Sequence, residues 1–249
     1  GMVIDPTVGN VTIEGNAKIE NAKSGDGGSG IGGGAIGIGN VTIRGNAQIG
    51  NAIGGEEGAG IGGGALGTGD VTIEGNVTIE NAQGGAGAAG IGGGAETQPD
   101  TEDTRNKVSI KSTEAGSPDI TATGGGASDG SLPGAAAIGS GSVADGATEV
   151  KSDITIEGKV TIDATAGGSI AKGDAIAIGD TPLQEKKFAG LPVGAVITRK
   201  DSDGVDLTQE GDKPTEPEKP EPEKPNPNPE NPNPEQPSEP SGAVSTSAP

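Results

Sequence analysis

A repeat of 30 residues constrains this 249-residue chain more than any other feature of its sequence. Three segments align without gaps: Asn10–Gly39, Asn40–Gly69 and the stretch that begins at Asp70. Each contains two short runs in which apolar residues recur at every second position, Val11/Ile13 and Ala17/Ile19 in the first repeat, and then a Gly-rich stretch that returns to a single isoleucine. Runs of this kind bounded by Gly and Asn are typical of β-strands, and a fixed period indicates a solenoid. We therefore expect an all-β chain of stacked repeats.

The repeat is strict at first and looser later. It is regular over residues 10–97 and degenerate over 108–179, where two imperfect copies bring the total to about five units. Atypical final repeats are expected where a solenoid is capped. We assign residues 1–179 to these repeats.

Two arrangements of the paired runs compete. Residues 71–73 and 77–79 could form a hairpin that turns at Gly75-Asn76, or they could lie on consecutive faces of a parallel β-helix. The middle repeat favours the β-helix, because it replaces a glutamate at both positions where stacked carboxylates would repel one another. The two sets of superimposed positions are Glu14, Arg44 and Glu74, and Glu20, Gly50 and Glu80.

Asparagine, by contrast, is retained in register. Asn amides form hydrogen bonds with copies of themselves along a stack, so an Asn ladder stabilises a parallel arrangement. We therefore predict a single-stranded, right-handed parallel β-helix with coils of about 30 residues, the handedness following the usual crossover preference. The predicted structural ladders are Asn16, Asn46 and Asn76, and Asn21, Asn51 and Asn81.

The GIGGGA runs carry no side chain large enough to fill space. We interpret them as a tight corner or a face where coils approach closely. They lack the following helix and lysine of a phosphate-binding loop.

Composition excludes several classes of function. The chain has no His, Cys, Trp or Tyr and a formal charge of -20. These absences argue against a His-based triad, thiolate chemistry and an ordinary zinc site. The negative charge opposes binding to nucleic acid or anionic membranes, and we expect no membrane insertion. We expect no cofactor, although an oxygen-only calcium site is possible.

The C-terminal part differs in composition. Residues 180–212 hold the only phenylalanine, Phe188, and several aliphatic residues, and we predict a cap on the open end of the solenoid. These aliphatic residues are Leu183, Leu191, Val193, Val196 and Ile197. Residues 213–249 contain proline at every second or third position as far as Pro240, which is typical of an extended polyproline II spacer.

The pattern VTIEGN-x-x-IENA with G-[AS]-G-IGGGA resembles Gly-rich β-helix repeats of cell-surface and carbohydrate-binding-like proteins from Gram-positive gut bacteria. The resemblance covers residues 10–97 well and 108–179 loosely. It implies a secreted, wall-associated protein with an adhesive or polysaccharide-related role, and the tail resembles a wall-spanning spacer. A weaker resemblance, at residues 135–147, is to the head repeats of trimeric autotransporter adhesins, whose repeats are much shorter.

One loop offers candidate calcium ligands. Asp26 and Glu56 share a register position and Glu57 follows, so acidic side chains on adjacent coils could hold calcium together with backbone carbonyls. The competing interpretation is a solvated loop on an acidic protein.

Two further interpretations are weaker. A glycosidase needs two carboxylates at a defined separation, and the repeat places acidic residues on its faces at Glu14, Glu20, Glu74, Glu80, Glu157 and Asp163. A threonine ladder at Thr12, Thr42, Thr72 and Thr155 could order water as in ice-binding proteins, but threonine is also simply a good outward strand residue.

The sequence therefore predicts a non-enzymatic, secreted or cell-wall-attached protein of a bacterial surface. In this interpretation the β-helix serves adhesion or glycan binding on a Pro-rich stalk, with host or polysaccharide glycans or surface proteins as partners. The alternative is a structural spacer that projects a binding domain. A polysaccharide-degrading enzyme is a third, weaker alternative.

Overall fold

The computed structural model describes residues 7–95, 105–126, 134–142, 150–168, 176–181, 184–188 and 191–214. The chain divides into two units, residues 1–216 and 217–249, and every described residue belongs to the first. The predicted spacer therefore lies almost wholly outside the described residues. None of the helices among the described residues is long and apolar enough to cross a membrane.

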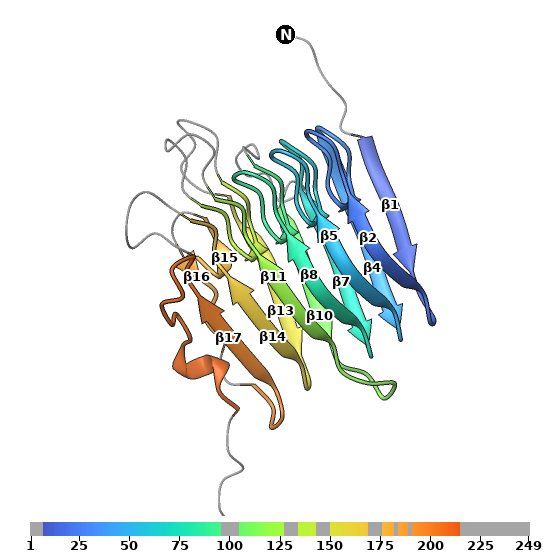
Figure 1. Ribbon diagram of the computed structural model, residues 1–249. Helices are drawn as coiled ribbons and strands as arrows, with labels where there is room; N and C mark the ends of the chain where they lie inside the picture. The colour runs from blue at the N-terminus through green and yellow to red at the C-terminus, as the bar shows by residue number, and fades with distance from the viewer. Residues whose placement is uncertain are drawn as a thin grey trace, which may run out of the picture. The chain divides into compact units, whose positions relative to one another are not determined.

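Three sheets account for the described strands (Figure 1). Sheet A contains β1 (Thr7–Ile13), β4 (Gly37–Gly45), β7 (Gly69–Gly75), β10 (Asn106–Lys111) and β13 (Ser152–Glu157). Sheet B contains β2 (Lys18–Lys23), β5 (Gln48–Ile53), β8 (Thr78–Gln83), β11 (Asp119–Thr123), β14 (Thr161–Thr165) and β17 (Val196–Lys200). Sheet C contains β3 (Ile31–Gly32), β6 (Ile61–Gly62), β9 (Ile91–Gly92), β12 (Ile138–Gly139), β15 (Ile178–Asp180) and β16 (Gln184–Glu185).

Each of the five coils supplies one strand to each sheet in turn. Among the described strands, every pair is parallel except β15 with β16, and in the strict repeats each residue pairs with the residue 30 positions later. The prediction of an all-β chain with stacked parallel strands is confirmed. The hairpin alternative is wrong, because Val71 pairs with Val41 and Val108 in sheet A, while Ile79 pairs with Ile49 and Ile120 in sheet B.

The core is a set of aliphatic columns that run along the stack. Alternation along each strand directs one valine or isoleucine inward at each register position, and the next coil covers it. In the second and third coils these side chains are 0–1% exposed, so the interior is filled without aromatic residues. The columns are Val11/Val41/Val71/Val108/Ile154, Ile13/Ile43/Ile73/Ile110/Ile156, Ile19/Ile49/Ile79/Ile120/Ile162 and Ile31/Ile61/Ile91/Ile138/Ile178.

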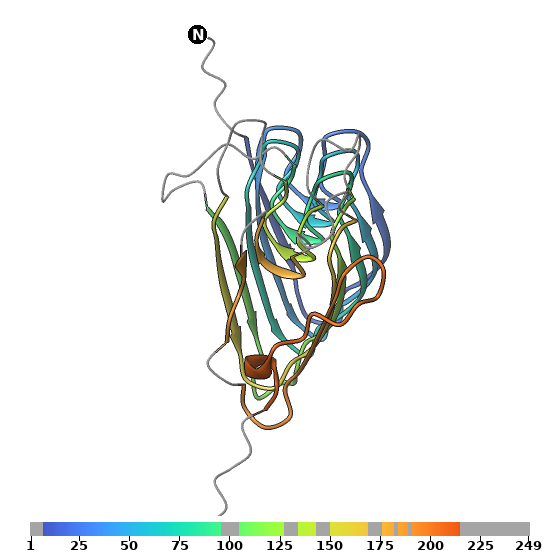
Figure 2. The ribbon, with the colours of Figure 1, turned by 90° about the vertical axis from the view of Figure 1, so that its left-hand side faces the viewer.

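The Gly-rich stretches form both sheet C and the loops that flank it (Figure 2). A Cβ atom on Gly64 would lie 2.0 Å from the carbonyl oxygen of Gly34 on the preceding coil, so only glycine permits this spacing. Gly62 has φ of 128°, a conformation that favours glycine. The expectation of close coil contact is confirmed, and the stretch is also a strand.

A register shift separates the strict repeats from the later ones. Between β8 and β11, Ile79 pairs with Ile120 and Ala82 with Ala122. Two residues of the third coil, Glu80 and Asn81, therefore lie opposite the single Thr121. The shift occurs where the sequence repeat stops being strictly 30 residues long, after residue 97.

The predicted cap region continues the stack before it ends. β17 adds a sixth strand to sheet B, with Ile197 in register with Ile162. A 3₁₀ helix, η2 (Glu210–Asp212), follows it. Of the aliphatic residues expected to fill the end, Leu191 and Ile197 are buried, whereas Val193 and Val196 are more than half exposed. Leu183 lies outside the described residues.

Candidate functional site

The outer face of sheet A is a regular polar surface made of three columns. Hydroxyl side chains form the central column and charged or amide side chains form the other two. In one outer column every register neighbour has the opposite charge, which removes the repulsion that identical stacked charges would cause. The columns are Thr12/Thr42/Thr72/Ser109/Thr155, Glu14/Arg44/Glu74/Lys111/Glu157 and Asn10/Asn40/Asp70/Lys107/Asp153.

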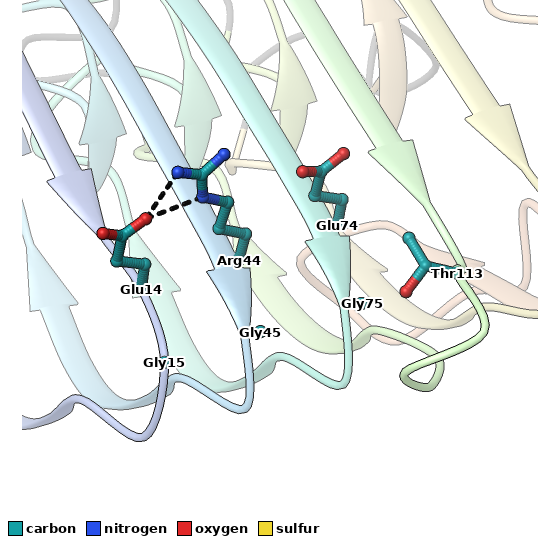
Figure 3. Close-up of a pocket in the computed structure, with 7 residues that line it drawn as sticks. All are labelled: Glu14, Gly15, Arg44, Gly45, Glu74, Gly75 and Thr113. Atoms are coloured by element: carbon teal, nitrogen blue, oxygen red, sulfur yellow. Dashed lines mark hydrogen bonds and ion pairs between the residues drawn. The ribbon is translucent and has the colours of Figure 1, made fainter.

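Arg44 makes the shortest ion pair in the alternating column. Its Nε and Nη2 atoms donate to Oε2 of Glu14 at 2.8 and 2.5 Å (Figure 3). The hydrogen bonds that Arg44 donates to Glu14, and then the negative charge of Glu14, raise the pKa of Arg44 above its ordinary value. Glu74 adds a smaller effect in the same direction. Both partners of the pair are about half exposed, so salt will screen their attraction.

This ion pair forms one side of an open pocket of about 330 Å³. The pocket lies at the ends of β1, β4 and β7, where glycines with positive φ turn the chain away from sheet A. Because these glycines have no side chains, the charged groups next to them stay accessible. The lining residues are Glu14, Gly15, Arg44, Gly45, Glu74, Gly75 and Thr113.

Glu74 and Thr113 give the pocket its remaining polar groups. The guanidinium of Arg44 is directed towards Glu14, and the Glu74 carboxylate lies on the other side of Arg44, between Arg44 and Thr113 (Figure 3). Within the described part of the chain, no hydrogen bond joins the Glu74 side chain to another residue. A carboxylate accepts hydrogen bonds, a guanidinium donates them and a hydroxyl does both. The arrangement suits a ligand that carries several hydroxyl groups.

The acidic residues considered from the sequence do not gather in one place. Glu14 and Glu74 line the same pocket on sheet A, with Arg44 between them. Glu157 lies in the same column and pairs with Lys111 at 3.4 Å. The others, Glu20, Glu80 and Asp163, lie on strands of sheet B, where Asp163 pairs with Lys200 at 3.3 Å.

The asparagines assigned to structural ladders are joined by side-chain hydrogen bonds. Asn46 donates to Asn16 at 3.1 Å, Asn76 to Asn46 at 3.2 Å, Asn51 to Asn21 at 2.9 Å and Asn81 to Asn51 at 3.2 Å. Each Nδ2 donates to the preceding coil. A further pair, in which Asn40 donates to Asn10 at 2.9 Å, was not predicted, although its 30-residue spacing could have revealed it.

Replacing the central asparagine of a ladder should cost more than replacing a terminal one. Asn51→Ala removes hydrogen bonds to both neighbours, whereas Asn21→Ala removes one. We expect Asn51→Ala to lower the free energy of unfolding by about 1–3 kcal/mol and Asn21→Ala by roughly half as much. Urea denaturation followed by circular dichroism measures both. Equal losses would contradict a continuous ladder.

The three calcium candidates lie in stacked loops between sheets B and C. Asp26 and Glu56 are exposed, and the amide of Gly27 donates to the backbone oxygen of Glu56 at 2.9 Å. Glu57 has φ of 63°, and its backbone oxygen accepts from Ala95 at 2.8 Å. Over the described residues, no group of three or more acidic side chains is placed to hold a metal ion. Calcium binding here stays a prediction.

One charged cluster was missed by sequence reasoning. Arg199 is fully buried at the C-terminal end of the stack, where it takes the register position of Ala164. Its guanidinium contacts Glu185 at 2.5 Å and Asp212 at 2.6 Å, and it lies 5.2 Å from the centre of the Phe188 ring. The sequence clue to this cluster was an arginine at the register position that alanine occupies in the preceding strand. Its ion pairs join β17 to the segments that contain Glu185 and Asp212.

Comparisons with protein-family models, with curated proteins and with solved structures found no match. The resemblance to Gram-positive surface repeats therefore stays a prediction from the sequence.

Proposed function

We propose that this chain is a non-enzymatic surface protein whose stacked coils bind carbohydrate through the outer face of sheet A. In this proposal the protein is secreted or attached to a bacterial cell wall, and the Pro-rich segment that starts at residue 213 serves as its stalk. Host or polysaccharide glycans are the proposed partners. The pocket that contains Glu14, Arg44, Glu74 and Thr113 is the observation that carries the proposal.

The chemistry of this pocket supports a ligand rich in hydroxyl groups. Glu74 offers a carboxylate that forms no hydrogen bond with other described side chains, and Arg44 and Thr113 lie on either side of it. A sugar diol can donate two hydrogen bonds to one carboxylate while it accepts from a neighbouring donor. The column of hydroxyls at Thr42 and Thr72 continues the polar surface beside the pocket.

Charge favours neutral or cationic glycans. The chain carries a formal charge of -20, and the pocket itself holds two carboxylates and one guanidinium. Long-range repulsion would disfavour acidic polysaccharides, whereas neutral sugars and amino sugars would not be repelled.

We also infer that the coils wind as a single-stranded, right-handed parallel β-helix closed by a C-terminal cap. Three parallel sheets that take one strand from each successive coil support this winding. Right-handed crossovers dominate among parallel β connections, which favours that hand. The buried Leu191, Ile197 and Arg199 at the last coil are consistent with a cap.

A glycan array tests the proposed function. We expect the full chain to bind at least one neutral or amino-sugar polymer, and Glu74→Gln to reduce that binding by about tenfold or more, because a carboxylate is a stronger acceptor than an amide. Glu80→Gln is the matched control, since it removes the same charge from the exposed face of sheet B.

Any of three results would overturn the proposal. Absence of binding to every neutral, cationic and acidic glycan on the array would favour the structural spacer instead. Equal binding by Glu74→Gln, Glu80→Gln and the unchanged chain would exclude the pocket as the site. Release of reducing ends from a soluble polysaccharide would indicate an enzyme.

A further inference from the structure

The charged side chains on the outer face of sheet A form bands that run across the sheet. In the third, fourth and fifth coils the two outer columns have the same sign on each strand. Relief of repulsion between stacked charges explains alternation within one column, but it does not explain why the two columns agree. The bands are Asp70 and Glu74 on β7, Lys107 and Lys111 on β10, and Asp153 and Glu157 on β13.

The acidic band of β7 (Asp70 and Glu74) and the basic band of β10 (Lys107 and Lys111) lie side by side, yet their charges are not joined to one another. Asp70 and Lys107 are register partners, but over the described residues neither side chain forms an ion pair. Glu74 forms none either, and Lys111 pairs with Glu157 on β13 at 3.4 Å. Both lysines are exposed and both carboxylates are partly exposed. These charges are therefore available to a ligand.

The backbone fixes the arrangement of the two bands. Neighbouring strands lie about 4.8 Å apart, so the carboxylates and the ammonium groups project from adjacent lines of a rigid sheet. Between the two outer columns, Thr72 and Ser109 add hydroxyls that can donate or accept hydrogen bonds. A ligand that carries hydroxyls and charged groups of both signs therefore meets complementary partners here. A ligand of a single sign would be repelled by one of the bands.

The charge balance of this face differs from that of the whole chain. Its two outer columns contain five carboxylates and three cations, whereas the chain has a formal charge of -20. A polymer with equal numbers of positive and negative groups escapes the long-range repulsion of the chain. Complementary charges at short range would then favour its binding to sheet A and fix its register.

We propose that the glycan bound by sheet A is a zwitterionic polysaccharide, whose free amino groups contact the acidic band and whose carboxylates contact the basic band. This inference rests on the proposed function of the face and specifies the class of its ligand. Glu74 belongs to both the pocket and the acidic band, so the ligand would extend from the pocket towards β10.

Four soluble derivatives of one glucosamine polymer test the ligand class. O-carboxymethyl chitosan carries amino groups and carboxylates, and glycol chitosan carries amino groups alone. O-carboxymethyl chitin, whose amines are acetylated, carries carboxylates alone, and glycol chitin carries neither. In titrations of the full chain we expect O-carboxymethyl chitosan to bind about tenfold or more tightly than O-carboxymethyl chitin, because only the former supplies cations for the acidic band.

Lysine variants separate the two bands. Lys107→Gln should weaken the binding of O-carboxymethyl chitosan by about threefold or more and should not weaken that of glycol chitosan, because the lysine contacts only carboxylates. Asp70→Asn should weaken the binding of both. Lys23→Gln, at an exposed position of β2 in sheet B, is the matched control for the change in net charge. Circular dichroism would verify that each variant keeps the fold.

The outcomes distinguish this inference from the function on which it rests. Suppose that glycol chitin or glycol chitosan binds through Glu74, and that Lys107→Gln affects O-carboxymethyl chitosan no more than Lys23→Gln does. The glycan site would then stand, and a zwitterionic ligand would be excluded. Equal affinity for O-carboxymethyl chitin and O-carboxymethyl chitosan would also overturn the inference. So would absence of binding to all four polymers, and the glycan array would then decide the proposed function independently.

Discussion

Replacing Gly55 with alanine is expected to lower the free energy of unfolding by about 3 kcal/mol or more. A Cβ atom on Gly55 would lie 1.7 Å from the carbonyl oxygen of Gly25 and 2.4 Å from its carbonyl carbon. Both atoms belong to the backbone of the preceding coil, so no side-chain rotation can relieve the clash. The coils would have to separate, which would break the hydrogen bond from Gly55 N to Gly28 O at 2.9 Å.

The repeat supplies a matched control for this substitution. Gly25 is the register equivalent of Gly55 in the first coil, and its Cβ would meet no atom within 4 Å. We expect Gly25→Ala to change the free energy of unfolding by no more than about 0.5 kcal/mol. Urea titrations of both variants provide the comparison. A similar effect for both would mean that the coils do not stack at the spacing described.

Replacing Arg199 with methionine is expected to destabilise the chain by about 3–5 kcal/mol, since it leaves the buried Asp212 carboxylate and the partly buried Glu185 carboxylate without their cation. Asp212 is fully buried and the Glu185 side chain is 15% exposed. The guanidinium also donates to the backbone oxygen of Lys186 at 2.8 Å, so its loss would loosen the segment around Lys186. Thermal unfolding with circular dichroism detection would measure the loss.

Two further variants separate the buried charge from a general effect at this end. Lys200→Met removes the neighbouring cation, whose pair with Asp163 is partly exposed, and should cost less than about 1 kcal/mol. Adding Glu185→Gln and Asp212→Asn to Arg199→Met should recover part of the lost stability, because the uncompensated charges disappear. Equal effects of Lys200→Met and Arg199→Met would contradict the role assigned to the buried cluster.

The regular part of the fold could be predicted because each repeat contains the same local information. Alternation of Val and Ile identified the strands, and the substitution of Arg44 between Glu14 and Glu74 pointed to parallel stacking. Both inferences depend only on the period. The Gly-rich stretch was harder, because a two-residue strand such as Ile61–Gly62 is too short to show alternation.

The irregular part depends on contacts that no period encodes. Arg199, Glu185 and Asp212 lie on three separate segments of the chain and meet only in the folded structure. The pocket beside Arg44 also combines a repeat column with Thr113, which belongs to the longer turn of the fourth coil. Residues of this kind become visible as a group only in three dimensions.

Engineered disulfides test the central claim, which is that successive 30-residue coils stack in parallel register. The chain has no cysteine, so any disulfide formed must join introduced residues. Thr42 and Thr72 are register partners on neighbouring strands, at a spacing of about 4.8 Å that a disulfide can span. Peptide mapping after mild oxidation should find this bond in Thr42→Cys/Thr72→Cys. It should find none in Thr72→Cys/Thr78→Cys, whose residues lie on sheets A and B. The reverse result would contradict the parallel stack.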